Sequence, residues 1–113
     1  MKRILLSIMA AGVMSGCSAE PPDCSDARTT KLVTDIAMKE IKKEPRWTPA
    51  ELKKIVLSLD MIRTTDINKD TGMKSCAADL VFTYESKNMN TSITYTSEMT
   101  DDEQQQVVTV YGL

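Results

Sequence analysis

The sequence contains no histidine among its 113 residues, and aromatic side chains make up only 4% of it. Histidine is the usual general base near neutral pH and the commonest metal ligand in proteins. Few pairs of nucleophile and base can be built without it, so we expect a protein that is not an enzyme and holds no cofactor. Long runs of basic residues are also absent and the formal net charge is only −2. This balance argues against a nucleic-acid partner.

Long hydrophobic runs are missing as well. The longest apolar stretch extends from Ile4 to Val13, well short of the roughly 18 residues that a transmembrane helix needs. It follows the basic pair Lys2-Arg3 and leads into small residues, an arrangement typical of a secretory signal. We therefore predict that residues 1–16 are a signal peptide.

The predicted signal peptide ends in Met14-Ser15-Gly16, directly before Cys17. This stretch resembles the lipobox of bacterial lipoproteins, with Met14 where the pattern usually has Leu. The resemblance implies cleavage after Gly16, diacylglycerol on the Cys17 thiol and a fatty acyl chain such as palmitate on the new N-terminus. Ser18 lacks the Asp signal for inner-membrane retention in enteric bacteria, so the resemblance implies a lipid anchor in the outer membrane, facing the periplasm. The alternative is an ordinary cleaved signal, with Cys17 as one more thiol.

Only two further cysteines follow, Cys24 and Cys76. With Cys17 lipidated, they allow one intramolecular disulfide, which suits an exported protein. Residues 17–23 are then the lipidated cysteine and a tether, and the six residues 18–23 reach at most about 20 Å. Residues 24–113 are long enough for a single small domain. Without residues 1–16, which hold two of the basic residues and no acidic ones, residues 17–113 have a net charge of −4.

The pattern of apolar residues predicts a helix from about 27 to 44, capped by Ser25 or Asp26, and a short helix after Thr48-Pro49-Ala50-Glu51. A period of two then predicts four strands, over residues 55–67, 76–84, 91–98 and 107–111. A bulge is expected at Met61-Ile62, and turns are expected at residues 68–72, 86–90 and 100–103. The predicted fold class is α+β: an N-terminal helix packed on a four-stranded antiparallel meander, stapled by one disulfide.

Oxygen-bearing side chains at alternate positions, Asp66, Asn68 and Asp70, precede Gly72 and resemble a calcium loop. The glycine comes one residue late and Ala77 stands where a bidentate acid belongs, so a plain hairpin turn is the favoured interpretation. The adjacent acids at 101–103 are interpreted as solvated turn residues.

Trp47 is the only tryptophan, next to Arg46 and directly before the predicted cap Thr48. It suits either a hydrophobic staple at the helix start or an exposed anchor at a protein interface, where Trp and Arg are enriched. An outward sheet face rich in hydroxyl groups, from Thr64, Thr91, Thr94, Thr96 and Ser97, suits either a solvated face or a polar docking surface.

These observations favour a non-enzymatic envelope lipoprotein that binds a protein partner near the membrane, for inhibition, immunity or superinfection exclusion. In general form the chain loosely resembles small lipoproteins of prophages and plasmids. Two alternatives stay open: a structural or assembly accessory of an envelope complex, and a module that binds calcium or another small ligand.

Overall fold

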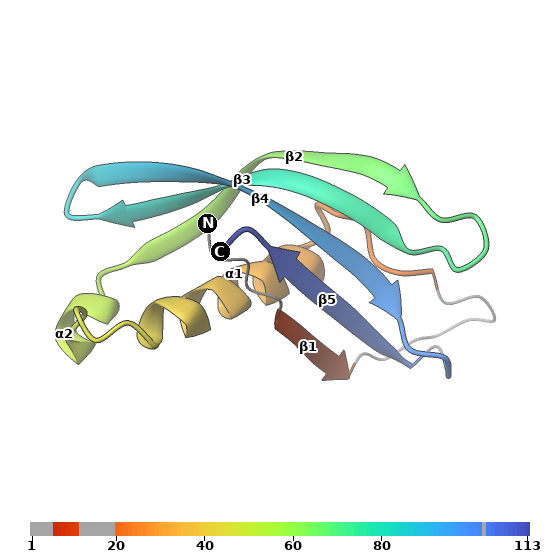
Figure 1. Cartoon of the computed structure of the whole chain (residues 1–113), viewed down its shortest axis with the longest axis horizontal. Coiled ribbons are helices and arrows are strands. Elements are labelled where there is room, and N and C mark those ends of the chain that lie inside the picture. Colours follow the sequence, from red (N-terminus) through yellow and green to blue (C-terminus); the bar gives the residue numbers. More distant parts are fainter. Residues whose placement is uncertain (1–5, 12–19, 103) are drawn as a thin grey trace.

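Two helices and five strands make up the fold of the computed structural model, which describes residues 6–11, 20–102 and 104–113 (Figure 1). The elements in chain order are β1 (Leu6–Ala11), α1 (Ala27–Lys42), α2 (Pro49–Leu52), β2 (Val56–Ile67), β3 (Lys74–Tyr84), β4 (Lys87–Met99) and β5 (Gln105–Tyr111). The lipobox residues 14–17 and Ser18 lie outside the described residues.

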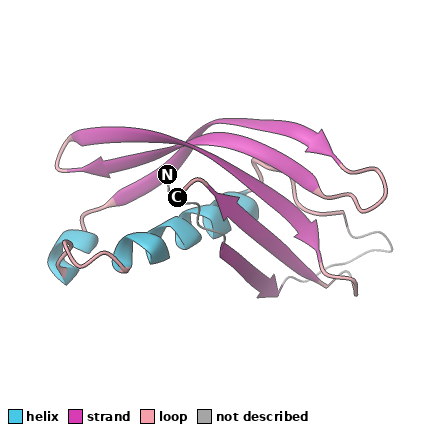
Figure 2. Ribbon diagram, in the orientation of Figure 1, coloured by secondary structure: helices cyan, strands magenta, loops and turns pink. Residues whose placement is uncertain are grey.

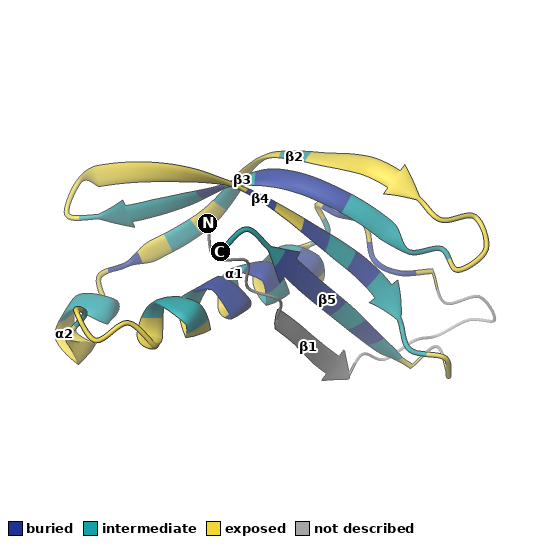
Figure 3. Ribbon diagram, viewed as in Figure 1, coloured by how far each residue is buried: buried dark blue, intermediate teal, exposed yellow. Residues whose placement is uncertain are grey.

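Helix α1 begins at a side-chain cap and ends shortly before a proline, as predicted. Asp26 accepts a hydrogen bond from the backbone N–H of Arg28 at 2.9 Å, and its bonds with Arg28 lower the pKa of the carboxyl group. The helix buries Val33, Ile36 and Ala37 against the sheet and leaves most of its charged residues in solvent (Figure 3).

The sheet is antiparallel throughout, with the strand order β1-β5-β4-β3-β2, and α1 lies against one of its faces (Figure 2). Strands β2 to β5 form a meander, because each strand pairs with the next one along the chain. The side chains of Ile93, Tyr95, Val108 and Val110 meet the apolar stripe of α1 in one core. The predicted α+β fold, a helix on an antiparallel meander with a disulfide, is confirmed.

The fifth strand, β1, was not predicted. It comes from the segment interpreted as a signal peptide and pairs with β5 from Leu6 opposite Val110 to Ala11 opposite Gln105. A short apolar run suits a buried strand as well as the apolar part of a signal, so its composition does not separate the two. Cleavage after Gly16 would leave the four predicted strands.

The predicted bulge in β2 is confirmed. The register of β2 relative to β3 shifts between Asp60 and Arg63, and Met61 in this interval has a positive φ of 55°. The extra residue returns Ile62 to the face that Leu57 and Leu59 present to the core.

The predicted turn over residues 86–90 is wrong. The chain reverses at Glu85 and Ser86, both with positive φ, and Tyr84 pairs directly with Lys87. This two-residue turn matches the twist of the strands without the Asn-Gly signal that usually marks it. Strand β4 therefore begins four residues before its predicted start.

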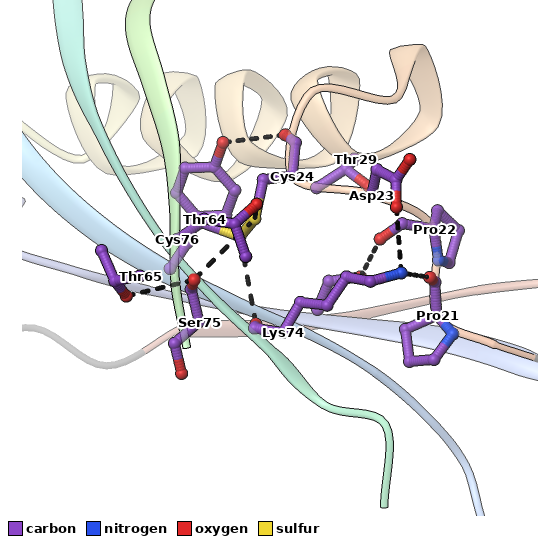
Figure 4. Close-up of a disulfide and its surroundings, with 12 residues drawn as sticks. Pro21, Pro22, Asp23, Cys24, Thr29, Thr64, Thr65, Lys74, Ser75 and Cys76 are labelled. Carbon is purple, nitrogen blue, oxygen red and sulfur yellow. Dashed lines mark hydrogen bonds and ion pairs between the residues drawn. A yellow bond between two sulfur atoms is a disulfide. The ribbon is translucent and has the colours of Figure 1, made fainter. Parts of the chain in front are cut away.

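The predicted disulfide between Cys24 and Cys76 is confirmed, with the Cα atoms 5.8 Å apart and a sequence separation of 52 (Figure 4). It joins the segment that leads into α1 to the buried face of β3. The Tyr95 hydroxyl donates a 2.9 Å hydrogen bond to the backbone carbonyl of Cys24, and burial raises the pKa of Tyr95 to about 12. Thr64 Oγ1 lies 3.3 Å from the Cys24 sulfur, so the cystine is enclosed by β2, β3 and β4.

The prediction of a free tether over residues 17–23 is wrong for its last three residues. Pro21 and Pro22 are buried, and their carbonyl oxygens accept hydrogen bonds from Lys74 Nζ at 2.7 Å and Ser97 Oγ at 3.0 Å (Figure 4). Lys74 Nζ also lies 3.0 Å from the Asp23 carboxylate. The segment Pro21–Cys24 is therefore part of the domain, which shortens any tether after Cys17 to residues 18–20.

A buried polar network joins this segment to α1, β4 and β5. Gln106 Nε2 donates to Thr29 Oγ1 and to Ser97 Oγ, each at 2.9 Å, and Ser97 in turn donates to Pro22. The prediction of an outward Ser97 is wrong, because Ser97 shares the alternation of Ile93 and Tyr95 and is fully buried. By the same alternation, Thr91 lies on the inward face.

Replacing both Cys24 and Cys76 with alanine should lower the free energy of unfolding by up to about 4 kcal/mol, because the unfolded chain regains the freedom of a 52-residue loop. Chemical denaturation measures the loss, and the far-UV circular dichroism spectrum should keep its strand signal. Mass spectrometry of the unreduced wild type should show two hydrogens fewer than the reduced form. Two free thiols in the purified protein would contradict the pairing.

Replacing Ser97 with alanine should destabilise the fold by about 1–3 kcal/mol, because the buried Pro22 carbonyl loses its donor and Gln106 loses an acceptor. Thr94→Ala is the matched control, since Thr94 is exposed on the opposite face of the same strand. Urea denaturation should show a clearly smaller loss for Thr94→Ala. Equal losses would mean that the buried network contributes nothing.

Candidate functional site

The inward face of the β3–β4 hairpin is longer than the helix that covers it. Cys76, Ala78 and Leu80 are buried under α1, whereas Phe82 and Tyr84, next on the same face, are only half-buried. Met89, which pairs with Phe82 from β4, is 63% exposed. The hairpin thus presents apolar side chains where the cover of α1 ends. Figure 3 shows this end of the hairpin as half-buried and exposed ribbon.

Trp47 lies against this uncovered part of the hairpin. Its ring centroid is 5.7 Å from that of Phe82 and 5.3 Å from that of Tyr84, with the second pair edge to face. The Arg46 guanidinium lies 5.5 Å from the Trp47 ring centroid and pairs with the Glu44 carboxylate at 2.7 Å. The Trp47 ring therefore packs against the hairpin and stays half-buried, and the staple and interface interpretations both stay predictions.

Helix α2 holds Trp47 in position through its first turn. Thr48 and Glu51 form the predicted capping box: Thr48 Oγ1 accepts from the Glu51 N–H at 3.2 Å, and the Thr48 N–H donates to Glu51 Oε1 at 2.9 Å. These bonds lower the pKa of Glu51, so its carboxylate is charged at neutral pH. The Tyr84 hydroxyl lies 3.5 Å from Glu51 Oε2, and burial, Glu85 and Glu51 raise its pKa, which keeps it a neutral donor.

Between these elements lies a groove of about 840 Å³, within the size range of ligand sites in proteins. Its walls come from the last turns of α1, the segment before α2, the β3–β4 hairpin and the residues after β5: Ala37, Glu40, Ile41, Lys43, Glu44, Pro45, Arg46, Trp47, Leu80, Phe82, Tyr84, Lys87, Met89, Thr91, Gly112 and Leu113. We call it the Trp47 groove.

Charges line the rim of the Trp47 groove and are mostly paired. Lys43 Nζ lies 2.9 Å from Glu40, and Arg46 pairs with Glu44. Lys87 makes no ion pair with any residue that the structure describes. The groove therefore has an apolar, aromatic floor and a rim with one unpaired cation, which suits burial of apolar side chains from a partner.

The predicted calcium-loop candidates do not come together as a site. Asn68 Oδ1 accepts the N–H groups of Asp70 and Thr71 at 2.9 and 3.1 Å, so it closes the turn on itself, and Gly72 adopts a φ of 79°. Asp66 lies in β2 opposite Ser75. Across residues 6–11, 20–102 and 104–113, no three acidic or cysteine side chains converge as metal ligands would. The segment is a hairpin turn.

The acidic run after β4 also lies in a turn. Asp101 and Asp102 are exposed, and Asp102 accepts hydrogen bonds from Thr100 Oγ1 and the Gln104 N–H, which lower its pKa. Glu103 and the predicted lipidation site Cys17 lie outside the described residues.

No known protein family, curated protein or solved structure matches the chain. None of the helices in the described part of the chain has the length and hydrophobicity needed to span a bilayer.

The sequence pattern did not predict that Phe82, Tyr84, Met89 and Leu113 belong to a site. A signal for the first two was available. At about 3.4 Å per strand residue and 1.5 Å per helix residue, an 11-residue strand is about 37 Å long and a 16-residue helix about 24 Å. A helix of that length cannot cover the whole alternating apolar face of β3.

Proposed function

We propose that this protein is a non-enzymatic lipoprotein of the cell envelope that binds a protein partner through the Trp47 groove. The observation that carries the proposal is the position of the aromatic side chains. The chain has one Trp, one Phe and three Tyr, and Trp47, Phe82 and Tyr84 all line this groove. Large aromatic side chains dominate the energetics of protein interfaces, and a chain with so few has gathered most of them at an accessible place.

The anchor part of the proposal depends on the lipobox resemblance of Met14-Ser15-Gly16-Cys17. With Cys17 acylated, only residues 18–20 separate the lipid from the docked Pro21, a reach of about 10–14 Å. Tethering at this length keeps the domain beside the bilayer and raises its effective concentration toward a partner in the same envelope.

Binding suits the groove better than turnover does. The carboxylates of Glu40 and Glu44 at its rim are already paired with Lys43 and Arg46, and the sequence supplies no histidine to act as a base. An apolar floor with a polar rim is the usual composition of an interface core and its surroundings.

Cys17→Ser should abolish lipidation. Labelled palmitate fed to producing cells should enter the wild-type protein and be absent from the variant, which should also keep residues 1–16. The intact mass of each protein measures both effects. Label in the variant, or unmodified Cys17 in the membrane-extracted wild type, would refute the anchor.

Met89→Ser should weaken partner binding about tenfold or more, because an exposed apolar contact at the groove is lost without touching the core. The matched control is Ile67→Ser, since Ile67 is also exposed, at 52%, but lies in β2 opposite Lys74, the residue at the other end of β3. Each variant, produced as the lipid-anchored chain, carries a photo-reactive crosslinker at Thr91 in the groove, and the yield of the specific adduct is measured. Trp47 fluorescence confirms that both variants are folded.

A second control separates contact from catalysis. Single alanine replacements of Asp66, Asp70, Asp101 and Asp102 should leave the adduct and the cellular phenotype unchanged. Equal loss from Ile67→Ser and Met89→Ser would remove the groove as the binding surface. If one of these acids proved indispensable in a normally folded protein, the result would favour an enzyme or a metal site over a binding surface.

A further inference from the structure

The two outer edges of the β2–β5 meander differ in how they are protected. Strand β2 carries Asp60, Arg63 and Asp66 and is interrupted by register shifts, devices that discourage addition of another strand. Strand β5, Gln-Gln-Val-Val-Thr-Val-Tyr, has no charge, proline or glycine, and its register with β4 is continuous. An edge of this kind readily accepts a further strand.

In the full chain β1 covers this edge over six consecutive residue pairs, from Leu6–Val110 to Ala11–Gln105 (Figure 1). The Gln105 carbonyl accepts from the N–H of Thr100, directly after β4, at 2.9 Å and so faces the β4 side. Backbone groups alternate sides along an antiparallel strand, so the N–H and C=O groups of Gln106, Val108 and Val110 face β1.

Removal of residues 1–16 would uncover these backbone groups. We infer that, in the processed protein, the β5 edge binds an extended segment of another protein, antiparallel to β5 and hydrogen-bonded to Gln106, Val108 and Val110. The inference rests on the processing step of the proposed function and adds a second surface to it. Strand addition at an exposed sheet edge is a common mode of peptide recognition.

The residues around the β5 edge determine which kind of segment can bind there. It needs about six extended residues, as β1 has, without proline at the positions that pair with β5. Helix α1 contacts both β5 and β1, so every second side chain of the segment would face α1 and should be apolar. The residues that follow β5, Gly112 and Leu113, line the Trp47 groove, so one partner can follow the edge and reach the groove.

A second copy of the chain fits this edge less well. Two β5 strands would pair antiparallel about a two-fold axis perpendicular to the sheet, which puts both α1 helices on the same face. Because α1 already reaches under the position of β1, the helix of a second copy would compete for that space.

The test compares the wild-type lipoprotein, extracted from membranes in mild detergent, with unprocessed Cys17→Ser. The probe is a fluorescent peptide with the sequence of residues 5–12. Two N-methylated versions serve as a matched pair: methyl groups at Ile8 and Ala10 block the amides that face β5, whereas methyl groups at Ser7 and Met9 point away from it.

Fluorescence anisotropy should show that the probe binds the processed wild type and fails to bind Cys17→Ser, whose edge is already covered. Methylation at Ile8 and Ala10 should weaken binding at least tenfold, and methylation at Ser7 and Met9 should leave most of it. Hydrogen exchange at Val108 and Val110 should be faster in processed wild type than in Cys17→Ser, and should slow at least tenfold when the probe is added.

Equal binding of the two methylated peptides, or no binding to processed wild type, would overturn the inference and leave the lipoprotein proposal standing. Exchange at Val108 that slows with protein concentration, together with dimers in sedimentation, would assign the edge to a second copy and overturn it as well. Wild type that retains residues 1–16 in its intact mass would refute the lipoprotein proposal first, and the edge inference with it.

Discussion

The fold depends on how the short segment Pro21–Cys24 is bound to the sheet. A single amphipathic helix has to cover one face of the sheet, and in so small a domain that burial leaves little net stability. The cystine at Cys24, the Tyr95 hydroxyl on its carbonyl and the bonds from Ser97 and Lys74 to the two prolines fix the start of α1 over β3 and β4. The buried Gln106–Thr29 bond then sets the helix over β5. Once its first turn is fixed, the rest of α1 can pack only along the face that its apolar stripe fits.

Local signals in the sequence predict most of this arrangement. The capping residues at Asp26 and Thr48, the alternation in β3 and the turn at Asn68–Gly72 act within a few residues, and each has the expected structure. The disulfide follows from counting, because two cysteines remain once Cys17 is assigned to the lipid. The remainder depends on contacts distant in sequence. Docking of Pro21 and Pro22 needs Lys74 and Ser97, and the early start of β4 depends on its partner strand, because Lys87, Asn88 and Asn90 give no strand signal of their own.

In the candidate site, too, some residues are predicted by local sequence signals and others depend on contacts distant in sequence. Trp47 and Arg46 stand out in the sequence because tryptophan is single and lies between two prolines. Their partners do not, since Phe82 and Tyr84 belong to a strand whose alternating apolar residues suggest ordinary core positions. Only the relative lengths of α1 and β3, and the position of the α2 turn, leave these side chains as the floor of a groove.

Strand β3 also gives the molecule a polarity. Its first residue, Lys74, binds the docked segment that follows the lipid site, and its last residue, Tyr84, packs against Trp47. About 34 Å of extended chain separates these two residues, much of the 45 Å long axis of the molecule. A lipid on Cys17 would therefore hold the β2–β3 turn toward the bilayer. The Trp47 groove would then lie at the end of the molecule that is farther from the membrane. With the long axis of the molecule upright on the bilayer, a partner bound there would project from the membrane or come from the space beyond it.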